Sequence, residues 1–326
     1  MSVAAFPNLP SSAITLRSAS DKTRAVFVPE WGGMMVSLQT QFLGAWRELL
    51  FLHDDFLERR LVDLPGGWPF CFPVCGRVAR NDQAGLYMCD GKPYYLAIHG
   101  FAWQQAWHVQ QHQDDCLVMQ LVSSELTKKQ YPFDFEVILT YRLRDDGLVC
   151  HQTYRNCGDD VMPFQAGFHP YFLTPPVVCA EGSGGCTKED VRLTCQSESQ
   201  LFYNENLSDI VDSSDMVATE CSISDHAVNE RLVRLGKDHR VGLFYPDGLA
   251  ITIEAKGVAD DSFFQYLQTY TMADETFICI EPWSGYPNAI NTVVGMDYLR
   301  SHQERQAVLY LVLSQTLDDE KQSPAL

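Results

Sequence analysis

The amino-acid sequence predicts an all-β fold, arranged as an antiparallel β-sandwich or barrel. Three observations lead to this expectation. Apolar residues recur at every second position in several segments, Asp-Gly pairs separate such segments, and convincing helical stretches are few. The chain has 326 residues, 46% of them hydrophobic, which is enough for a sizeable core. With no linker and no internal repeat, we expect one domain over residues 1–315 and an acidic tail at 316–326.

Individual strands follow from side-chain periodicity and turn chemistry. Between 135 and 143, every second residue from Phe135 is apolar, which is typical of a half-buried strand. Asp146-Gly147 and Asp247-Gly248 are strong hairpin signals, each with an apolar run on both sides. The predicted strand segments lie within residues 115–124, 135–143, 147–156, 240–255 and 306–314.

Four segments have no clear strand pattern. Residues 228–236 are compatible with a short helix or a turn, and residues 43–52 are ambiguous. Residues 64–78 contain three prolines, three glycines and several aromatic residues, which indicates a well-packed ordered loop. Residues 174–190 form a second irregular stretch.

Composition excludes several classes of function. A net charge of −18 makes nucleic acid an improbable partner, since phosphate binding needs clustered Lys and Arg. No apolar run reaches the roughly 20 residues of a membrane helix, and the N-terminus does not resemble a signal peptide. Eleven scattered cysteines argue against a disulfide framework and indicate a reducing compartment, so we expect a cytoplasmic protein. Cys71 and Cys75 are expected to be buried free thiols, and no metal site is expected.

Four polar side chains stand among aromatic residues and tight turns: Arg77, His99, His169 and Glu281. Taken singly, each has a structural explanation: an ion-paired arginine, a turn histidine, a core histidine and a buried ion pair. Glu281 is the hardest to explain in this way, because it follows the buried-strand run "FICI" and an unpaired buried carboxylate is costly. Together the four suit a carbohydrate site, in which aromatic rings cover sugar faces and polar groups bind hydroxyls. A glutamate and a histidine also make an acid/base pair that works near neutral pH.

Other mechanisms find little support. The sequence lacks the Gly-x-Ser-x-Gly elbow, a Walker loop, the dinucleotide glycine fingerprint and His-Glu-x-x-His. A glycosidase needs two carboxylates, and the pattern singles out one.

Five short motifs occur along the chain: "FPVCGRV", "HGFAWQQAW", "YPFDFEVILTYRL", "GFHPYF" and "IEPWSGYPNAIN". In this order, from Phe72 to Asn291, they resemble the aldose 1-epimerase (galactose mutarotase-like) family. The resemblance implies a large antiparallel β-sandwich, the galactose mutarotase-like supersandwich, with a sugar in an open cleft on one sheet. It also implies the interconversion of the α and β anomers of an aldose without metal or organic cofactor.

The resemblance further implies roles for single residues. His169 corresponds to the general acid and Glu281 to the general base, while Arg77 and His99 correspond to sugar-binding residues. The family also uses an aspartate that holds sugar hydroxyls. Asp225 lies at a compatible place but in a poor local match, and the competitors are Asp209 and Asp247.

One departure bears on the substrate. Relatives that act on hexose 6-phosphates commonly have Arg after "HGFA", whereas this chain has Trp103. Together with the negative charge, this favours a neutral sugar; the alternative is a phosphate bound from elsewhere in the chain by Arg80, Lys92 or Lys128. A hexose-6-phosphate mutarotase and a non-catalytic carbohydrate-binding module stay open as alternatives. We expect a monomer or a weak homodimer, with a small sugar as the partner.

Overall fold

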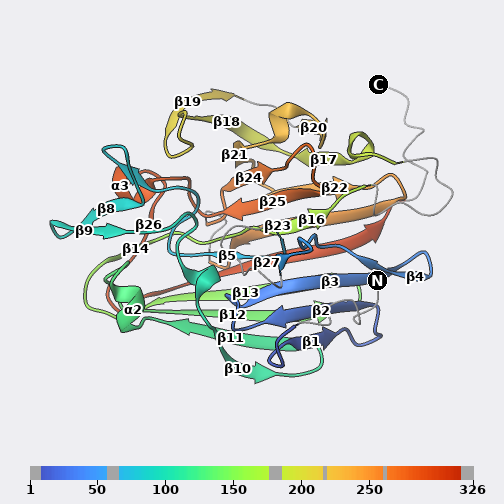
Figure 1. The fold of residues 1–326 in the computed structure, drawn as a ribbon, viewed down its shortest axis with the longest axis horizontal. Helices are drawn as coiled ribbons and strands as arrows, with labels where there is room; N and C mark the ends of the chain where they lie inside the picture. Colours follow the sequence, from blue (N-terminus) through green and yellow to red (C-terminus); the bar gives the residue numbers. More distant parts are fainter. Residues whose placement is uncertain (1–8, 57–65, 176–185, 216–218, 260–262, 317–326) are drawn as a thin grey trace.

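The computed structural model describes residues 9–56, 66–175, 186–215, 219–259 and 263–316. Within these residues almost all regular structure is β-strand, and the strands pair antiparallel, which confirms the predicted all-β fold (Figure 1). The predicted acidic tail at 316–326 lies, beyond Thr316, outside the described residues.

Two large sheets dominate the molecule. In spatial order, the nine-stranded sheet contains β10 (His108–His112), β11 (Cys116–Val122), β12 (Phe135–Arg144), β13 (Gly147–Asn156), β27 (Glu304–Gln315), β23 (Leu249–Gly257), β22 (Arg240–Phe244), β17 (Arg192–Cys195) and β20 (Thr219–Ser222). The eight-stranded sheet contains β19 (Ile210–Asp215), β18 (Ser197–Tyr203), β21 (Arg231–Leu235), β24 (Tyr266–Tyr270), β25 (Phe277–Trp283), β15 (Gly167–Phe168) and β5 (Phe70–Cys71), with β16 (Tyr171–Leu173) also on β25.

Smaller elements complete the fold. A four-stranded sheet holds β1 (Ile14–Arg17), β2 (Thr23–Val28), β3 (Met34–Phe42) and β4 (Ala45–Glu48). Two-stranded pairs are β14 (Met162–Phe164) with β26 (Asp297–Leu299), β6 (Ala79–Arg80) with β7 (Gln83–Ala84), and β8 (Leu86–Cys89) with β9 (Lys92–Tyr95). The helical turns are α2 (Glu125–Lys128), α3 (Ala289–Thr292), η2 (Ala102–Gln104), η3 (Lys188–Asp190) and η4 (His226–Val228).

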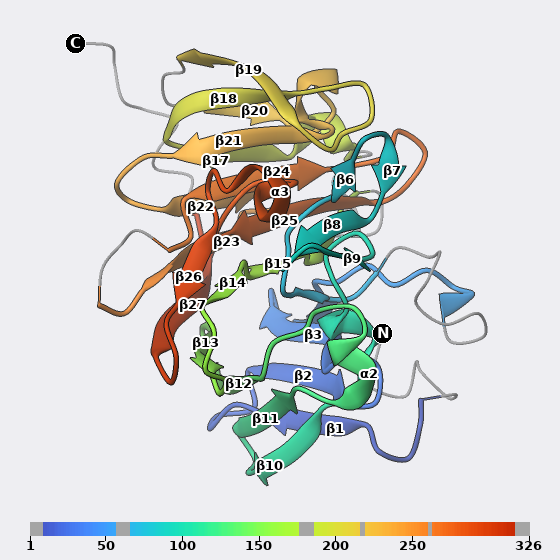
Figure 2. The ribbon, with the colours of Figure 1, turned by 90° about the vertical axis from the view of Figure 1, so that its left-hand side faces the viewer.

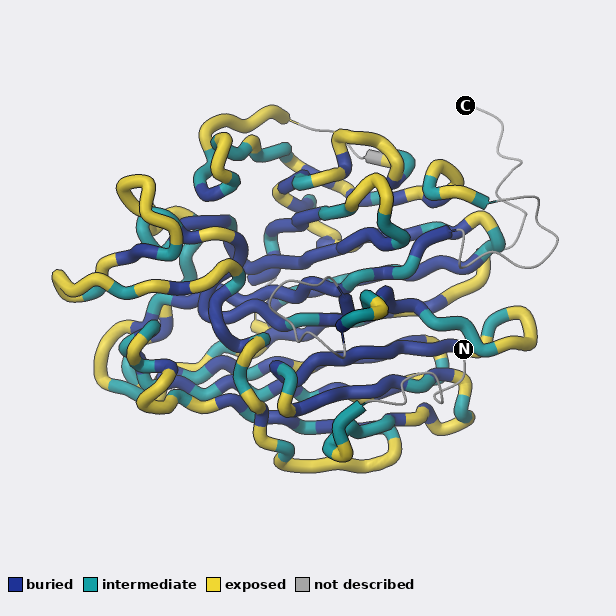
Figure 3. Tube along the Cα trace, in the orientation of Figure 1, coloured by how far each residue is buried: buried dark blue, intermediate teal, exposed yellow. Residues whose placement is uncertain are grey.

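The sheets pack as a sandwich around one large apolar core (Figures 2 and 3). Ring contacts join the layers. The rings of Phe27 on β2 and Tyr141 on β12 are 4.8 Å apart, and Phe70 on β5 stacks on Tyr154 of β13 at 6.4 Å. Large aromatic side chains bury much apolar area, so these contacts hold the nine-stranded sheet against the four-stranded and eight-stranded sheets. The predicted sandwich is thereby confirmed.

The strand pattern read from residues 135–143 is confirmed in β12, where buried positions alternate with less buried ones. Both Asp-Gly hairpins are confirmed as well. Arg144 pairs with Gly147 across the first turn, and β22 pairs with β23 across the second. Period-two patterning and turn residues therefore located these strands correctly.

Two ambiguous segments proved to be strands. Residues 228–236 contain the end of η4 and then β21, so a helix there is wrong. Residues 43–52 contain β4. The predicted ordered loop is confirmed for residues 66–78, where Trp68 and Phe72 are almost fully buried; residues 64–65 lie outside the described residues, as do residues 176–185 of the second irregular stretch.

The expectation for Cys71 and Cys75 is confirmed, since both are buried free thiols. Nine cysteines of the described segments are free, in line with the expected lack of a disulfide framework, whereas Cys186 is disulfide-bonded.

Candidate active site

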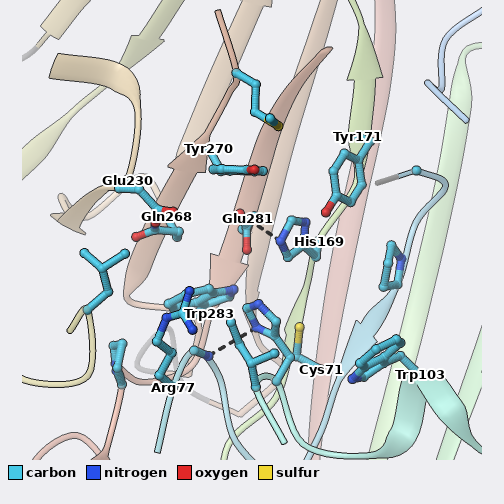
Figure 4. Close-up of a pocket in the computed structure, with 18 of the residues that line it drawn as sticks. Cys71, Arg77, Trp103, His169, Tyr171, Glu230, Gln268, Tyr270, Glu281 and Trp283 are labelled. Carbon is cyan, nitrogen blue, oxygen red and sulfur yellow. Dashed lines mark hydrogen bonds and ion pairs between the residues drawn. The ribbon is translucent and has the colours of Figure 1, made fainter. Parts of the chain in front are cut away.

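A cavity of about 660 Å³ opens on the eight-stranded sheet, on the side away from the main core. It collects residues that are far apart in sequence (Figure 4). Four of the five residues predicted for the site line this cavity: Arg77, His99, His169 and Glu281.

Glu281 lies near the end of β25, and strand periodicity explains its direction. Ile278 and Ile280 join the main core, so the alternate residues Cys279, Glu281 and Trp283 point to the other face of the sheet. The Glu281 side chain is only 1% exposed. The run "FICI" therefore forms a buried strand, as predicted, and it delivers a carboxylate to the floor of the cavity.

His169 lies between β15 and β16, directly opposite Glu281. Its backbone N–H donates to the carbonyl of Pro69 at 2.9 Å, and its ring stacks on Tyr171 with centroids 4.7 Å apart. Its Nε2 is 3.3 Å from Oε1 of Glu281. In the described part of the chain, His169 Nδ1 and Glu281 Oε2 are buried without a hydrogen-bond partner. The pair is thus held close but left with unused hydrogen-bonding capacity.

His99 stands beside this pair on a tight turn. Its φ is +61°, and Gly100 follows at +74°, where an added Cβ would lie 2.2 Å from the Phe72 carbonyl oxygen. Glycine is therefore required at 100. The His99 ring packs edge-on against His169 at 5.0 Å, and the backbone N–H of Gly76 donates to His99 Nδ1 at 3.2 Å. Nδ1 is therefore unprotonated in the neutral ring, and Nε2–H is left as a donor.

Arg77 follows Gly76 on the same rim and is exposed toward the cavity. Asn288 donates its backbone N–H to the Arg77 carbonyl at 2.9 Å, and its side-chain oxygen accepts from the Ala79 N–H at 3.1 Å. The "NAIN" motif therefore braces the loop that carries Arg77.

Burial sets the protonation of the His169–Glu281 pair. It raises the pKa of Glu281 well above the usual 4.5, and the nearby Glu230 carboxylate raises it further. The Trp283 indole approaches Glu281 without reaching hydrogen-bond geometry and offsets part of this rise in pKa. Burial lowers the pKa of His169 to about 4. Both shifts favour the neutral forms, so a single proton on the pair resides on the Glu281 carboxyl while His169 is neutral.

Burial also lowers the pKa of His99 well below 6.5, and the neighbouring His169 and Arg77 act in the same direction. His99 is therefore neutral, and its Nε2–H is a permanent donor into the cavity.

The aspartates considered for sugar binding do not line the cavity. Asp225 is exposed and accepts the Ala227 N–H at 2.9 Å as the N-cap of η4. Asp209 accepts from the Asn288 side chain at 2.6 Å and braces that loop. Asp247 forms a buried ion pair with Arg47 in the β22–β23 turn. The structure therefore places Asp225 outside the cavity, with its side chain engaged in capping the start of η4.

A carboxylate that the sequence reading missed, Glu230, lines the cavity instead. It directly precedes β21 with a φ of +50°, and the Gln268 side-chain N–H donates to it at 3.2 Å. Gln268 in turn accepts from the Tyr203 hydroxyl at 2.8 Å and pairs across β24–β25 with Glu281. Burial raises the pKa of Glu230, and Arg77 partly opposes this. The sequence "NER" leads into β21, which begins at Arg231. Glu230 was missed because this segment was interpreted as a short helix or a turn.

His99, His169 and Glu281 bring one ligand-type atom each within 4.8 Å of one another, a spacing that suits a metal ion. The Gly76 N–H argues against His99 as a ligand. This N–H points at Nδ1 of His99. A metal bound at Nε2 would need the ring proton to be on Nδ1, and two N–H donors would then face each other. The three groups are better suited to hydrogen-bonding the oxygens of a ligand than to holding a metal.

A sandwich of antiparallel sheets with an acid/base pair in an aromatic-lined cleft defines a class of protein that acts on small polar ligands such as sugars. The family model described as Aldose 1-epimerase matches residues 13–293. This chain belongs to the aldose 1-epimerase family, a family of isomerases.

Individual relatives agree with this assignment. An Escherichia coli K12 protein provisionally named a glucose-6-phosphate 1-epimerase is 25% identical over 259 residues, which cover 75% of this chain and 77% of that protein. A solved structure from Synechocystis sp. PCC 6803 is 26% identical, with a TM-score of 0.75, over 93% of this chain and 96% of that one. A galactose mutarotase related enzyme from Lactobacillus acidophilus, 21% identical, shares the fold, with a TM-score of 0.77 over 94% and 98% of the two chains. Among the described helices, none is long and apolar enough to span a bilayer.

Proposed function

We propose that this protein is an aldose 1-epimerase that interconverts the anomers of an uncharged aldose, with Glu281 and His169 as its catalytic residues. The observation that carries the proposal is the 3.3 Å contact between His169 Nε2 and Glu281 Oε1 on the cavity floor. A general acid and a general base must both lie within hydrogen-bond reach of the reacting oxygens, and this pair offers both at one point.

The reaction uses the single proton that the pair shares. When a sugar enters, the proton of the Glu281 carboxyl passes to His169 Nε2 across their 3.3 Å contact. The O1 hydroxyl then faces the Glu281 carboxylate, and the ring oxygen O5 faces the protonated His169 Nε2. Glu281 takes the O1 proton as the C1–O5 bond breaks, and His169 gives its proton to O5. The open-chain aldehyde rotates about C1–C2. On closure, His169 takes the proton back from O5 and Glu281 returns one to O1, so the pair ends as it began.

Neighbouring groups are placed to bind the remaining hydroxyls. His99 offers its Nε2–H, Arg77 offers a guanidinium, and Glu230 offers a carboxylate held by Gln268. The Trp283 ring, almost fully buried and 5.6 Å from His99, forms part of the cavity wall beneath these groups. This set resembles the sugar-binding set expected for the family, with a glutamate in the place of the aspartate.

Charge favours a neutral sugar over a hexose 6-phosphate. Among the described residues that line the cavity, Arg77 is the one lysine or arginine, against three glutamates: Glu230, Glu275 and Glu281. The cations considered for phosphate binding lie elsewhere. Lys128 pairs with Asp134 at 2.7 Å, and Arg80 and Lys92 do not line the cavity.

The test is anomer exchange measured by saturation-transfer NMR on glucose, galactose and glucose 6-phosphate. We expect wild-type protein to accelerate exchange of at least one neutral aldose, and His169→Asn to lose about 10²–10⁴-fold of that acceleration. Saturable sugar binding without exchange would instead establish a carbohydrate-binding module. Faster exchange of the phosphate than of either neutral sugar would overturn the substrate assignment.

The cytoplasm is part of the proposal. The nine free cysteines among the described residues support a reducing compartment, and the disulfide at Cys186 is the observation against it.

A further inference from the structure

The Glu281 carboxylate needs a second hydrogen-bond donor besides His169. Burial keeps the proton on the Glu281 carboxyl at rest, whereas the reaction uses Glu281 as a carboxylate after that proton has passed to His169. A carboxylate that is 1% exposed has lost its water, so a protein donor is needed to stabilise its negative charge. His169 contacts Oε1, and Oε2 is buried without a hydrogen-bond partner in the described part of the chain.

The Trp283 indole N–H is a donor close to this carboxyl group. Trp283 and Glu281 are two residues apart on β25, so their side chains leave the strand on the same face, and Figure 4 shows them next to each other. The Trp283 Nε1 is likewise buried without a hydrogen-bond partner among the described residues. Its N–H acts to lower the pKa of Glu281, whereas burial and the Glu230 carboxylate raise it. A donor and an acceptor, both buried and both unpaired, therefore lie close together.

The indole ring is fixed in place. Trp283 is 2% exposed and packs within a buried apolar cluster. Gly167 on β15 pairs with Trp283, and a Cβ added at Gly167 would lie 2.6 Å from the indole Cδ1, the atom bonded to Nε1. The His99 ring packs against another edge at 5.6 Å. The carboxyl group of Glu281 is the part that can turn, because the last torsion of a glutamate side chain is broad.

Burial distinguishes this role from sugar binding. Trp283 forms part of the cavity wall, but its Nε1 is buried, so the N–H is not presented to a ligand. We propose that Trp283 is a positioning residue: when the carboxyl proton of Glu281 passes to His169 Nε2, the carboxylate turns and accepts the indole N–H, which holds Glu281 in its base form. This inference rests on the proposed function and adds a residue to its mechanism.

The other titratable groups near Glu281 leave its titration visible. The thiols and phenols that interact with it belong to Cys71, Cys75, Cys279, Tyr171, Tyr203 and Tyr270. Burial raises the pKa of each of these groups, so they stay neutral at neutral pH, and burial lowers the pKa of His99 well below 6.5. Glu230 and Arg77 are the same in every variant below, so a difference between variants reports on the residue that was changed.

The first test follows the indole N–H itself and needs no turnover. In heteronuclear NMR spectra of sugar-free protein titrated with base, the Trp283 signal is identified by its absence from Trp283→Phe. As Glu281 loses its proton, the Trp283 proton signal should move downfield, because a hydrogen bond to a carboxylate is shorter and stronger than one to a neutral group. In Glu281→Gln the signal should stay in place over the same pH range. A Trp283 signal that does not move in wild type, or that moves equally in Glu281→Gln, overturns the inference.

The second test is kinetic and uses Trp283→Phe, which keeps an aromatic ring and removes the N–H. With the neutral aldose that exchanges fastest, kcat should fall about tenfold, the loss of one hydrogen bond to a charged group. KM should stay within about twofold, because sugar binding is retained. The alkaline limb of the pH–rate profile should move to higher pH, since a carboxylate that has lost a donor binds its proton more tightly. The acid limb, set by the His169 pKa of about 4, should stay in place.

Trp68→Phe is the matched control. Trp68 is 1% exposed, its Nε1 also lacks a hydrogen-bond partner within the described segments, and it is not part of the described lining of the cavity. The control should keep both kcat per folded molecule and the alkaline limb.

The outcomes separate the possible roles of Trp283. An unchanged kcat in Trp283→Phe overturns the inference. So does a lower kcat with the alkaline limb in place, since that result assigns Trp283 a structural role. A raised KM with an unchanged kcat overturns it in favour of sugar binding. If wild-type protein exchanges no sugar, the proposed function fails instead, and the NMR titration decides by itself whether Trp283 donates to Glu281.

Discussion

Replacing Glu281 by glutamine separates catalysis from stability. Glutamine keeps the shape of the side chain and its hydrogen-bonding reach toward His169, but it cannot accept a proton from a sugar hydroxyl. A general base contributes about 10²–10⁴-fold to a rate, so Glu281→Gln should lose that factor, or about 3–5 kcal/mol of transition-state stabilisation.

The same change should stabilise the fold. Burial raises the pKa of Glu281 well above 4.5, so between pH 4.5 and its folded pKa the folded protein binds more protons than the unfolded chain. Stability contributed by Glu281 therefore falls as pH rises through this interval. At pH 7 the loss is at most about 4 kcal/mol, from about 1.4 kcal/mol for each pH unit above 4.5. Glutamine does not titrate, so the variant should recover up to this amount, and the gain should vanish near pH 4.5.

Two measurements on one preparation test this: anomer exchange by NMR, and urea unfolding at pH 4.5 and pH 7. Glu48→Gln is the matched control, because Glu48 is a carboxylate outside the cavity whose oxygens accept from Ser37 at 2.5 Å, Leu38 at 2.9 Å and Leu50 at 3.0 Å. Burial raises the pKa of Glu48 as well, so this variant controls for the loss of a buried carboxylate and should leave exchange per folded molecule unchanged. Exchange by Glu281→Gln within threefold of wild type would refute the base assignment, and a lower stability at pH 7 would refute the desolvation argument.

Three further predictions concern the pair and its surroundings. The exchange rate at saturating sugar should be flat from about pH 5 to neutrality and fall below about pH 4, because the pKa of His169 is about 4 and a second proton makes the pair cationic; an acid limb centred near pH 6.5 in the pH–rate profile contradicts this. Glu230→Gln should raise KM about tenfold with kcat little changed, since it removes a charge-assisted hydrogen bond to a sugar hydroxyl; steady-state kinetics that show an unchanged KM exclude Glu230 from binding. Asp247→Asn should lower the free energy of unfolding by about 3–5 kcal/mol, because it leaves the Arg47 charge buried without its partner, while exchange per folded molecule stays constant; urea unfolding that matches wild type contradicts this.

Strand and turn prediction succeeded where local chemistry decides structure. The alternation in β12 and the Asp-Gly turns before β13 and β23 need only near neighbours in sequence to be recognised. Residues 228–236 were harder, because apolar residues in "VNERLVRLG" are compatible with both a helix and a strand. Pairing of β21 with β18 and β24 decided in favour of the strand.

The candidate site was predicted only in part, because some of its residues stand out within short segments and others do not. His169 and Glu281 are unusual within their own segments, so the sequence singles them out. Glu230 is an ordinary glutamate in a charged stretch, and it enters the cavity only because Gln268 on β24, 38 residues later, holds its carboxylate. Asp225 looked equally suitable, yet the cap of η4 occupies it.

The sequence by itself indicated the strands with clear alternation and the Asp-Gly turns, and it singled out His169 and Glu281, because alternation, turn residues and a carboxylate after a buried run act over a few residues. Only the tertiary structure decided that Glu281 and His169 lie 3.3 Å apart, that burial raises the pKa of Glu281 and lowers that of His169, and that Glu230 rather than Asp225 lines the cavity. Those features depend on strand pairing between distant segments and on the water excluded where the segments meet, and neither is encoded in any short stretch of the chain.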